Sequence, residues 1–137
     1  MATNINSQEI QINRSANKVV DFLSDLNNYA SLMPKEVNMF EVEGDQATLH
    51  VDGLGKFQLV VSEKTADQIV LKPSGKLPFD FDIVWTVTPT AAGSSVLGTI
   101  RANLNPFIKL LAEPKLRSFV DAQAVNMQTY LESSIPE

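Results

Sequence analysis

The sequence predicts an α+β domain in which a long C-terminal helix covers one face of an antiparallel β-sheet. Between residues 36 and 104, apolar side chains tend to alternate with polar ones, and the runs are separated by short turn-rich segments. The stretch FDFDIVWTV, residues 79–87, shows this alternation most clearly. After residue 104 the apolar spacing changes to that of an amphipathic helix. A sheet that is apolar on one face needs a cover, and this helix is long enough to provide it.

Composition restricts the class of protein. With 137 residues, 44% of them hydrophobic, the chain has the size of one domain, which we assign to residues 1–137. It contains no cysteine, its N-terminus lacks the apolar core of a secretory signal, and no apolar run reaches the ~20 residues of a membrane span. We therefore expect a soluble, cytoplasmic protein without stable membrane insertion. The net charge of −5, with scattered Lys and Arg, argues against nucleic acid as a partner.

The first 34 residues are predicted to contain one strand and two short helices. Residues 5–13 form the strand, with Ile10 and Ile12 on one face. Ser15 caps a helix, SANKVVDFLSD, whose apolar residues follow helical spacing. A second short helix, NNYASLM, ends before Pro34, because the residue before a proline disfavours the helical conformation.

Six further strands are predicted at 36–43, 46–52, 56–64, 68–73, 79–88 and 95–104. Their pairing is restricted, because a slip of one residue would turn apolar side chains towards water. At the pair of Trp85 with Gly98, the missing side chain of the glycine leaves room for the indole. The other predicted pairs are Phe40 with Leu49, Val42 with Ala47, Leu49 with Leu59, Asp52 with Lys56, Phe81 with Ala102, Asp82 with Arg101 and Ile83 with Ile100.

The C-terminal segment is predicted to be helical but interrupted. Pro114 should break or restart the helix, which gives a short turn at 106–112 and a main helix at 114–133. At ~1.5 Å per residue the main helix is roughly 30 Å long, enough to cross the sheet. Its apolar stripe carries one polar residue, Gln123, in the middle. The stripe itself consists of Leu116, Phe119, Val120, Met127, Tyr130 and Leu131.

This order of elements resembles that of the START-like (SRPBCC) superfamily, which includes lipid-transfer proteins, aromatase/cyclase-type proteins and plant pollen-allergen proteins. The stretch INRSANKVVDFLSDLNNYASLMP is similar to the family's opening strand and helix pair, and NPFIKLLAEPKLRSFV resembles the start of its closing helix. The resemblance implies the helix-grip fold, a curved, roughly seven-stranded antiparallel sheet wrapped around the C-terminal helix. It covers nearly the whole chain in element order, but its motifs are packing patterns that specify function poorly.

In this superfamily the sheet and the helix commonly enclose a cavity for an apolar ligand. Carried onto this sequence, the resemblance places Tyr29 and Met33 near the mouth of the cavity. Gln123, Trp85 and Tyr130 would orient the guest, because each combines a polar atom with an apolar body. The remaining walls would be Leu49, Leu59, Val61, Leu71, Phe81, Ile83, Phe119 and Met127.

Few residues offer catalytic or metal-binding chemistry. Glu63 is the only ionisable residue among the strand positions assigned to the inward face, and it falls at a strand end. It is either a solvated carboxylate at the rim or, as the weaker alternative, a catalytic acid or base. The sequence has no cysteine and one histidine, His50, whose position predicts an outward side chain. We therefore expect no metal site and no cofactor.

Two features have more than one interpretation. The amide of Gln123 either bonds to a backbone carbonyl, to Tyr130 or to trapped water, or it anchors the polar head of a ligand. The segment at 106–112 holds more apolar residues than one buried stripe can contain. It is a short helix packed on the sheet edge, a lip over the cavity mouth, or a contact patch for a protein partner.

Three functions are compatible with these observations. The first is a non-enzymatic protein that binds or carries an apolar small molecule, of lipid or polycyclic aromatic type, because the inward face is apolar and almost uncharged. The second is a cyclase- or dehydratase-like enzyme on the same fold, which would need Glu63 or a tyrosine in the pocket. The third is a filled-core domain that contacts another protein, because large inward aromatic side chains can leave no void.

Overall fold

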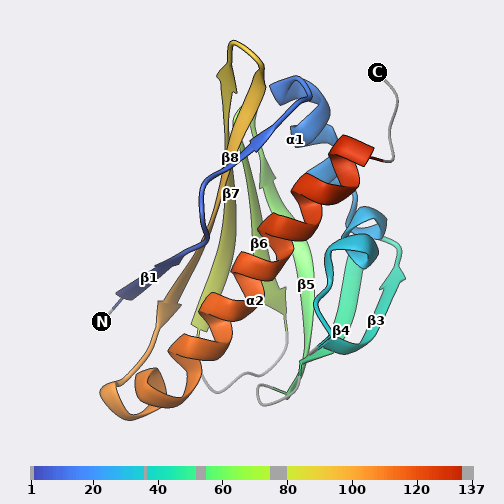
Figure 1. Ribbon diagram of the computed structural model, residues 1–137. Helices are drawn as coiled ribbons and strands as arrows, with labels where there is room; N and C mark the ends of the chain where they lie inside the picture. Colours follow the sequence, from blue (N-terminus) through green and yellow to red (C-terminus); the bar gives the residue numbers. More distant parts are fainter. Residues whose placement is uncertain (1, 36, 52–54, 75–79, 134–137) are drawn as a thin grey trace.

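The computed structural model describes residues 2–35, 37–51, 55–74 and 80–133. A curved antiparallel sheet wraps around the long C-terminal helix α2, which crosses its concave face diagonally (Figure 1). This arrangement confirms the predicted α+β helix-grip fold. Within the described residues the sheet has eight strands, in the order β1-β8-β7-β6-β5-β4-β3, with β2 also paired to β8. The strands are β1 Ala2–Asn6, β2 Ile10–Ile12, β3 Val37–Glu43, β4 Gln46–Val51, β5 Gly55–Lys64, β6 Gln68–Ser74, β7 Asp80–Thr90 and β8 Gly93–Asn103.

The single strand predicted at 5–13 is two strands, because one extra residue interrupts its pairing with β8. Ile5 pairs with Ile100 in β1, whereas Ile10 pairs with Val96 in β2, so the register shifts between them. Ser7 bonds to one residue of β8 at this shift. Its N–H donates to the Gly98 carbonyl at 2.8 Å, and its hydroxyl accepts from the Gly98 N–H at 2.9 Å. An irregularity of this kind bends a strand, and both halves contact α2.

The two short helices follow β2, as predicted. Helix α1, Ala16–Ser24, begins after Ser15, whose hydroxyl accepts a hydrogen bond from a backbone N–H of the first turn. The second is a 3₁₀ helix, η1, Leu26–Leu32, which Asp25 caps in the same way. Both turn apolar residues into the core, and α1 covers one end of the sheet near the C-terminal end of α2 (Figure 1).

Helix α2, Pro106–Ser133, runs through Pro114 without interruption, so the predicted break at this proline is wrong. A proline inside a helix removes one N–H and frees the carbonyl four residues before it, which here is that of Leu110. Pro114 and Leu110 are both exposed, so water can bind the freed carbonyl and the helix continues. At the start of α2, the side-chain oxygen of Asn105 accepts from the Ile108 N–H at 2.8 Å and caps the helix.

The predicted register of the β4–β5 hairpin is wrong, whereas the other predicted pairs between described strands are confirmed. Leu49 pairs with Phe57 and not with Leu59, and Lys56 pairs with His50. The register slides because β5 begins at Gly55, whose positive φ of 101° suits a tight turn. The confirmed pairs are Phe40 with Leu49, Val42 with Ala47, Phe81 with Ala102, Asp82 with Arg101, Ile83 with Ile100 and Trp85 with Gly98. Asp52 and Phe79, which also entered the predicted pattern, lie outside the described residues.

Candidate functional site

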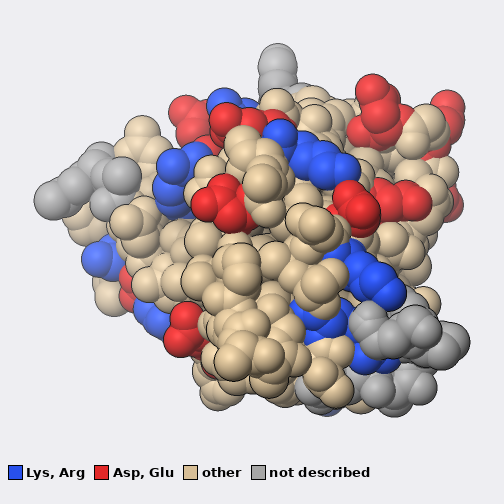
Figure 2. Space-filling model, turned by 90° about the horizontal axis from the view of Figure 1, so that it is seen from above, with Lys and Arg blue, Asp and Glu red and all other residues tan. Residues whose placement is uncertain are grey.

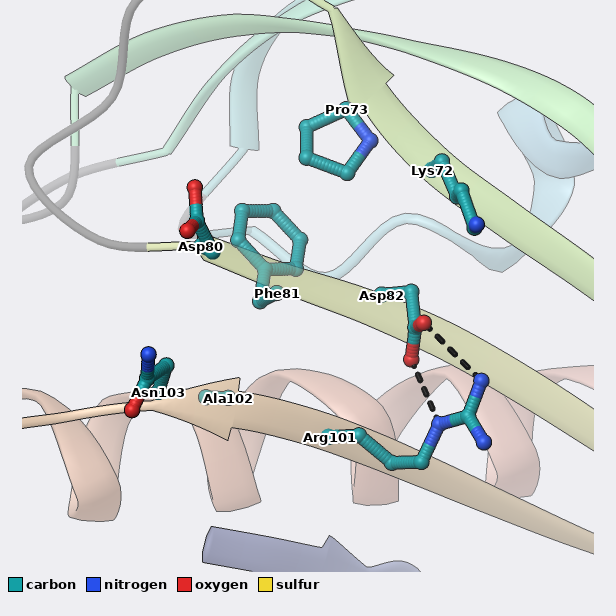
Figure 3. A pocket seen from close by; sticks show the side chains of 8 residues that line it. All are labelled: Lys72, Pro73, Asp80, Phe81, Asp82, Arg101, Ala102 and Asn103. Carbon is teal, nitrogen blue, oxygen red and sulfur yellow. Dashed lines mark hydrogen bonds and ion pairs between the residues drawn. The ribbon is translucent and has the colours of Figure 1, made fainter. Parts of the chain in front are cut away.

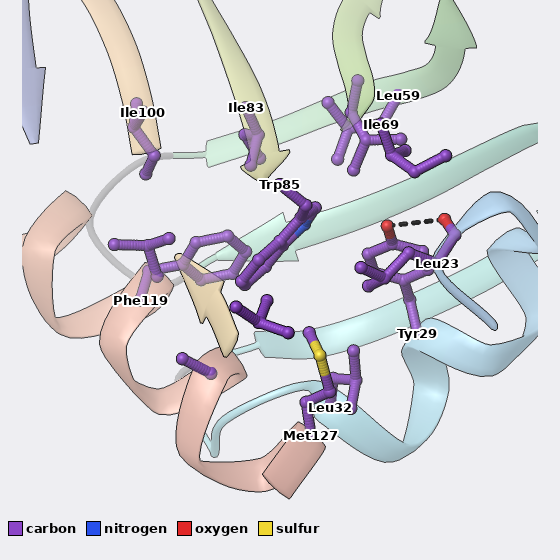
Figure 4. Close-up of a cluster of buried hydrophobic side chains, with 14 of the residues drawn as sticks. Leu23, Tyr29, Leu32, Leu59, Ile69, Ile83, Trp85, Ile100, Phe119 and Met127 are labelled. Carbon is purple, nitrogen blue, oxygen red and sulfur yellow. Dashed lines mark hydrogen bonds between the residues drawn. The ribbon is translucent and has the colours of Figure 1, made fainter. Parts of the chain in front are cut away.

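The candidate site is the interior between the concave face of the sheet and α2. Side chains from the strands point towards the helix, and the helix directs its apolar stripe back at them (Figure 4). Of the predicted wall residues, Val61 and Phe81 are half-buried. The buried ones are Leu49, Leu59, Leu71, Ile83, Trp85, Phe119, Gln123 and Met127. The structure therefore brings most of the predicted wall together around one interior.

Trp85 is wedged between a strand and the helix. A Cβ atom added at Gly98 would lie 2.6 Å from Cζ3 of Trp85 and 2.9 Å from Cγ2 of Val120. These distances are shorter than a carbon–carbon contact, so the indole and the valine already occupy the space that a side chain at Gly98 would need. The glycine thus leaves room for the indole, as the predicted pairing requires.

The interior is packed closely around Trp85, Leu49 and Met127. Trp85, Leu49 and Met127 each have 0% of their surface accessible to water. A water-sized void beside a side chain would leave part of its surface accessible, so no such void touches these three. The packing around Trp85 is that of an ordinary protein core. A guest in this place must therefore displace side chains.

Two polar atoms of the interior have no partner. Oε1 of Gln123 and Nε1 of Trp85 are buried without a hydrogen bond to any described residue. Gln123 is 1% exposed, and its Nε2 lies 3.9 Å from Sδ of Met33, which is a weak acceptor. The amide is bonded neither to Tyr130 nor to a backbone carbonyl. The interior therefore offers one free acceptor and one free donor, each at a cost of about 1–3 kcal/mol.

Phe57 of β5 is a wall residue that the sequence analysis misses. It is buried, and its ring packs edge-on against that of Phe81, with centroids 5.6 Å apart and planes at 89°. Phe57 has the same strand parity as Leu59, which was placed inward, so alternation alone was sufficient to find it.

A groove of about 530 Å³ opens between β6 and β7 (Figure 3). The β6–β7 ladder ends at the pair of Leu71 with Ile83, and the two strands separate beyond it. Phe81, Pro73 and Ala102 contribute apolar side chains to the groove. Phe81 thus belongs both to the lining of this groove and, through its contact with Phe57, to the edge of the packed interior.

Charged side chains form the rim of the groove. Arg101 donates from Nε to Oδ1 of Asp82 at 2.7 Å and from Nη2 to Oδ2 at 2.9 Å, as the predicted pairing requires (Figure 3). These hydrogen bonds raise the pKa of the Arg101 guanidinium. Lys72 and Asp80 lie on the same rim.

The sequence from residue 6 to residue 132 matches a family described as polyketide cyclase/dehydrase and lipid transport. The chain belongs to this family. Its membership agrees with the START-like resemblance of the element order. No curated protein matches the sequence of this family member significantly.

Solved structures share the fold of this polyketide cyclase/dehydrase and lipid transport family member at low sequence identity. Norcoclaurine synthase from Thalictrum flavum, in complex with dopamine and hydroxybenzaldehyde, has a TM-score of 0.77 at 13% identity, over 100% of this chain and 90% of that one. A START superfamily protein from Mycobacterium smegmatis has a TM-score of 0.66 at 16% identity, over 98% of both chains. The di-domain ARO/CYC protein StfQ from the steffimycin biosynthetic pathway has a TM-score of 0.70 at 15% identity, over 96% of this chain and 51% of that one. These likenesses establish the START-like fold alone.

Glu63, the weak catalytic candidate, points away from the interior. Val61 pairs with Leu71, but Glu63 pairs with Val70, so one residue of β5 is bulged out between them. The bulge moves Glu63 to the outer face of the sheet, where it is exposed and its charge acts on Arg101. The inward position predicted for Glu63 is therefore wrong.

Tyr29 is a core residue and not part of a mouth. It is 2% exposed, and its hydroxyl donates to the carbonyl of Leu23 at 2.7 Å (Figure 4). Burial raises the pKa of this phenol far above its usual value, so the group is neutral. Met33 and Tyr130 are half-buried at the boundary of the interior, and the ring of Tyr130 lies 5.5 Å from that of Phe22.

The charged side chains that the structure describes lie outside the core. No buried side chain among those described carries a formal charge. Figure 2 shows acidic and basic side chains interspersed on one face of the molecule, without a continuous basic surface there. In the part of the chain that the structure describes, no group of three or more His, Cys, Asp or Glu is placed to hold a metal ion. His50 is half-buried on the outer face, between the inward Leu49 and Val51.

Proposed function

We propose that this protein binds and carries an uncharged, apolar small molecule between the sheet and α2. The observation that carries the proposal is the unpartnered carbonyl of Gln123, buried in an otherwise apolar interior. If position 123 served packing alone, an apolar side chain would be more stable there, because an unpartnered buried amide costs about 1–3 kcal/mol. A ligand that donates a hydrogen bond would remove this cost. The description of the family, which includes lipid transport, supports the same function.

The guest should be uncharged. No charged side chain is buried among the described residues, and the phenol of Tyr29 is neutral and already bonded to Leu23. A carboxylate or ammonium group that entered this interior would lose its hydration without gaining a counterion. Neutral lipids, alcohols, phenols and ketones remain as classes of guest.

A hydroxyl group is the polar group that fits best. It can donate to Oε1 of Gln123 or accept from Nε1 of Trp85, both of which are without partners. A pure hydrocarbon would satisfy neither atom. We therefore expect a hydroxylated apolar guest to bind more tightly than the corresponding hydrocarbon, with burial of apolar surface supplying most of the affinity at about 25 cal/mol per Å².

The packed interior must expand to admit a guest. Met127 and Met33 have unbranched, flexible side chains that can change rotamer at low cost, and both adjoin the interior. Phe81 lies where the groove between β6 and β7 reaches the interior. We expect the guest to enter on this side, with the side chain of Phe81 moving first.

Binding can be tested by native mass spectrometry and thermal-shift screening with matched pairs of neutral compounds, each an alcohol or phenol and its deoxygenated analogue. We expect the wild-type protein to prefer the hydroxylated member, and Gln123→Met to lose that preference while still binding the apolar body. The control is Gln68→Met, which changes an amide outside the buried interior and should leave the preference intact. If no compound binds or shifts the melting temperature, the proposal fails.

The second candidate is a filled-core domain that contacts another protein. It is favoured by the absence of accessible surface on Trp85, Leu49 and Met127. The same screen separates the two, because a filled core would resist expansion and bind no member of any pair. An acid–base reaction is not proposed, because the bulge in β5 places Glu63 on the outer face.

A further inference from the structure

The two margins of the sheet differ in how they are protected from pairing with another strand. The marginal strands are β1 and β3, and no described strand pairs with the outer side of either (Figure 1). Proteins usually protect such an edge with charged side chains, proline or a bulge. β3 carries the exposed Glu41 and Glu43 and a register shift between Val37 and Met39. β1, with the sequence ATNIN, has neither a charged residue nor a proline.

Half of the backbone groups of β1 point away from the sheet. In an antiparallel pair, residues that bond to the partner strand alternate with residues that do not. The Ser7 N–H donates to the carbonyl of Gly98, one pair beyond the end of the β1–β8 ladder. Counting back from Ser7, the odd-numbered residues of β1 bond to β8, and the outward N–H and C=O groups belong to Ala2, Asn4 and Asn6. These groups have no backbone hydrogen bond to a described residue.

The outer edge of β1 is self-complementary about Asn4. When two copies of the strand pair antiparallel with Asn4 opposite Asn4, each outward N–H meets an outward carbonyl of the other copy, which gives about six hydrogen bonds. The Asn4 side chain is exposed on the outer face, and its amide offers both a donor and an acceptor to its own copy. On the inner face the half-buried Thr3 lies opposite Ile5 of the other copy. No like charges meet in this register.

We propose that two copies of this protein associate through β1, so that their sheets join into one continuous antiparallel sheet. The partner is a second copy, because the same outward residues supply the donors and acceptors on both sides of the two-fold axis. Pairing of β1 with β3 of another copy would propagate into a filament, and the charges and the bulge of β3 disfavour it. The contact is one short strand pair, so the dimer is weak and depends on protein concentration.

The dimer leaves the groove between β6 and β7 accessible. In the sheet, β8 and β7 separate this groove from β1. The association is therefore independent of the proposed guest, and Gln123→Met should leave it unchanged.

The start of α2 is the alternative contact surface. Ala112 is buried and Ile108 is half-buried, but three large apolar side chains are 73%, 78% and 61% exposed: those of Phe107, Leu110 and Leu111. The packed alternative for the segment at 106–112 therefore holds for the first two residues and is wrong for the other three. No described helix, α2 included, is long and apolar enough to cross a membrane.

Sedimentation velocity at increasing protein concentration measures the association. We expect the wild-type protein to change from monomer to dimer as its concentration rises towards about 1 mM. Asn4→Pro should weaken the dimer at least tenfold, because it removes one outward N–H and places a ring where the second strand would lie. It leaves the bonds between β1 and β8 intact, so the melting temperature of the dilute protein should stay close to that of wild type.

A charge at position 4 tests the register without altering the backbone. Position 4 faces itself across the axis, so Asn4→Lys should weaken the dimer roughly tenfold by placing two ammonium groups opposite each other. An equal mixture of Asn4→Lys and Asn4→Glu should associate again, because opposite charges then meet. The control, Thr88→Lys, adds the same charge at an exposed position of β7 and should associate like wild type.

Cross-linking tests the same register directly. The sequence has no cysteine, so a single introduced one reports its own distance to the second copy. Hydrogen-bonded antiparallel residues have Cα atoms about 5.5 Å apart, within the range of a disulfide. Asn4→Cys should therefore form a covalent dimer under mild oxidation, and Thr88→Cys should not.

Four results would overturn the proposal. The first is that the wild-type protein stays monomeric at every concentration, and the second is that Asn4→Pro and Asn4→Lys dimerise as well as wild type. The third is that Asn4→Cys forms no covalent dimer. The fourth is that Leu110→Ser/Leu111→Ser abolishes a dimer that Asn4→Pro leaves intact, because the contact would then lie at the start of α2.

Discussion

The six-membered ring of Trp85 lies where a side chain of Gly98 would be. A Cβ atom at position 98 would come within 2.6 Å of Cζ3 and 2.9 Å of Cη2 of the indole, and within 2.9 Å of Cγ2 of Val120. Gly98 therefore couples β7 to α2, since its lack of a side chain lets the indole pass across β8 to the helix. If residue 98 had a methyl side chain, as alanine has, Trp85 and Val120 would have to move away, and the distance between the sheet and α2 at this point would increase.

Gly98→Ala should destabilise the fold by about 1–3 kcal/mol, because the added methyl overpacks a core with no free space. Urea denaturation checks this value, and the melting temperature should fall by roughly 4 °C per kcal/mol. Trp85→Phe removes the edge that the methyl would strike. We therefore expect the double variant Gly98→Ala/Trp85→Phe to lose less stability than the two single variants together. Strict additivity would contradict the contact.

Tyr29 should make the stability fall at high pH. Burial raises the pKa of its phenol above the unfolded value of about 10, so the stability that it contributes is complete below pH ~10 and is lost as the pH rises further. For this one proton the slope approaches about 1.4 kcal/mol per pH unit well above pH 10, and the total loss between pH 9 and 11 is about 1.4 kcal/mol. Urea denaturation between pH 9 and 11 (roughly the span of tyrosine titration) measures the slope in a Tyr130→Phe background, where Tyr29 is the only tyrosine.

The control for this pH dependence is Tyr29→Phe in the same background. It should lower the stability at neutral pH, because the Leu23 carbonyl loses its partner at 2.7 Å, and it should have a flatter profile above pH ~10. Equal slopes with and without the Tyr29 phenol would show that other groups cause the alkaline loss.

The register of two strands can be predicted from the sequence where the size and charge of directly paired side chains allow only one alignment. The β7–β8 register follows from Trp85 opposite Gly98 and Asp82 opposite Arg101, because size and charge there admit one alignment. The register of β4 with β5 is different: a slide of two residues keeps the same side chains inward, so Leu49 meets Phe57 without any change in parity. Only the position of the turn at Gly55 separates the two alignments.

The errors in the candidate site have related causes. The bulge in β5 reverses which face of the sheet the following side chains point to, so Glu63 lies on the outer face. No residue type in β5 indicates in advance that a bulge occurs there. Tyr29 was expected near the mouth of the cavity, but its hydroxyl donates to the backbone carbonyl of Leu23, in the preceding helix α1, and the side chain is buried in the core. The packing of the interior depends on how closely α2 approaches the sheet. That distance is a property of the whole fold and not of any short stretch.

The two ion pairs between described residues should differ in strength. Arg101 and Asp82 form two parallel hydrogen bonds, and the Asp82 side chain is 19% exposed. Lys64 and Asp21 form one contact of 3.1 Å, with side chains that are 47% and 74% exposed. We expect Arg101→Gln to cost up to about 1 kcal/mol and Lys64→Gln less than about 0.5 kcal/mol, as measured by urea denaturation. In 1 M NaCl both effects should shrink, because screening weakens exposed pairs.

Gln123→Met should stabilise the free protein, although it alters the proposed binding site. The substitution keeps an unbranched side chain of similar length and removes a buried carbonyl that has no partner, so the free energy of unfolding should rise by about 1 kcal/mol or more. Asn126→Leu is the matched control on the same helix. Its amide donates to the Leu32 carbonyl at 3.0 Å, so removing it should destabilise the fold by about 1 kcal/mol. If Gln123→Met costs as much as Asn126→Leu, then Oε1 of Gln123 already has a partner, such as a trapped water, and is not available to a guest.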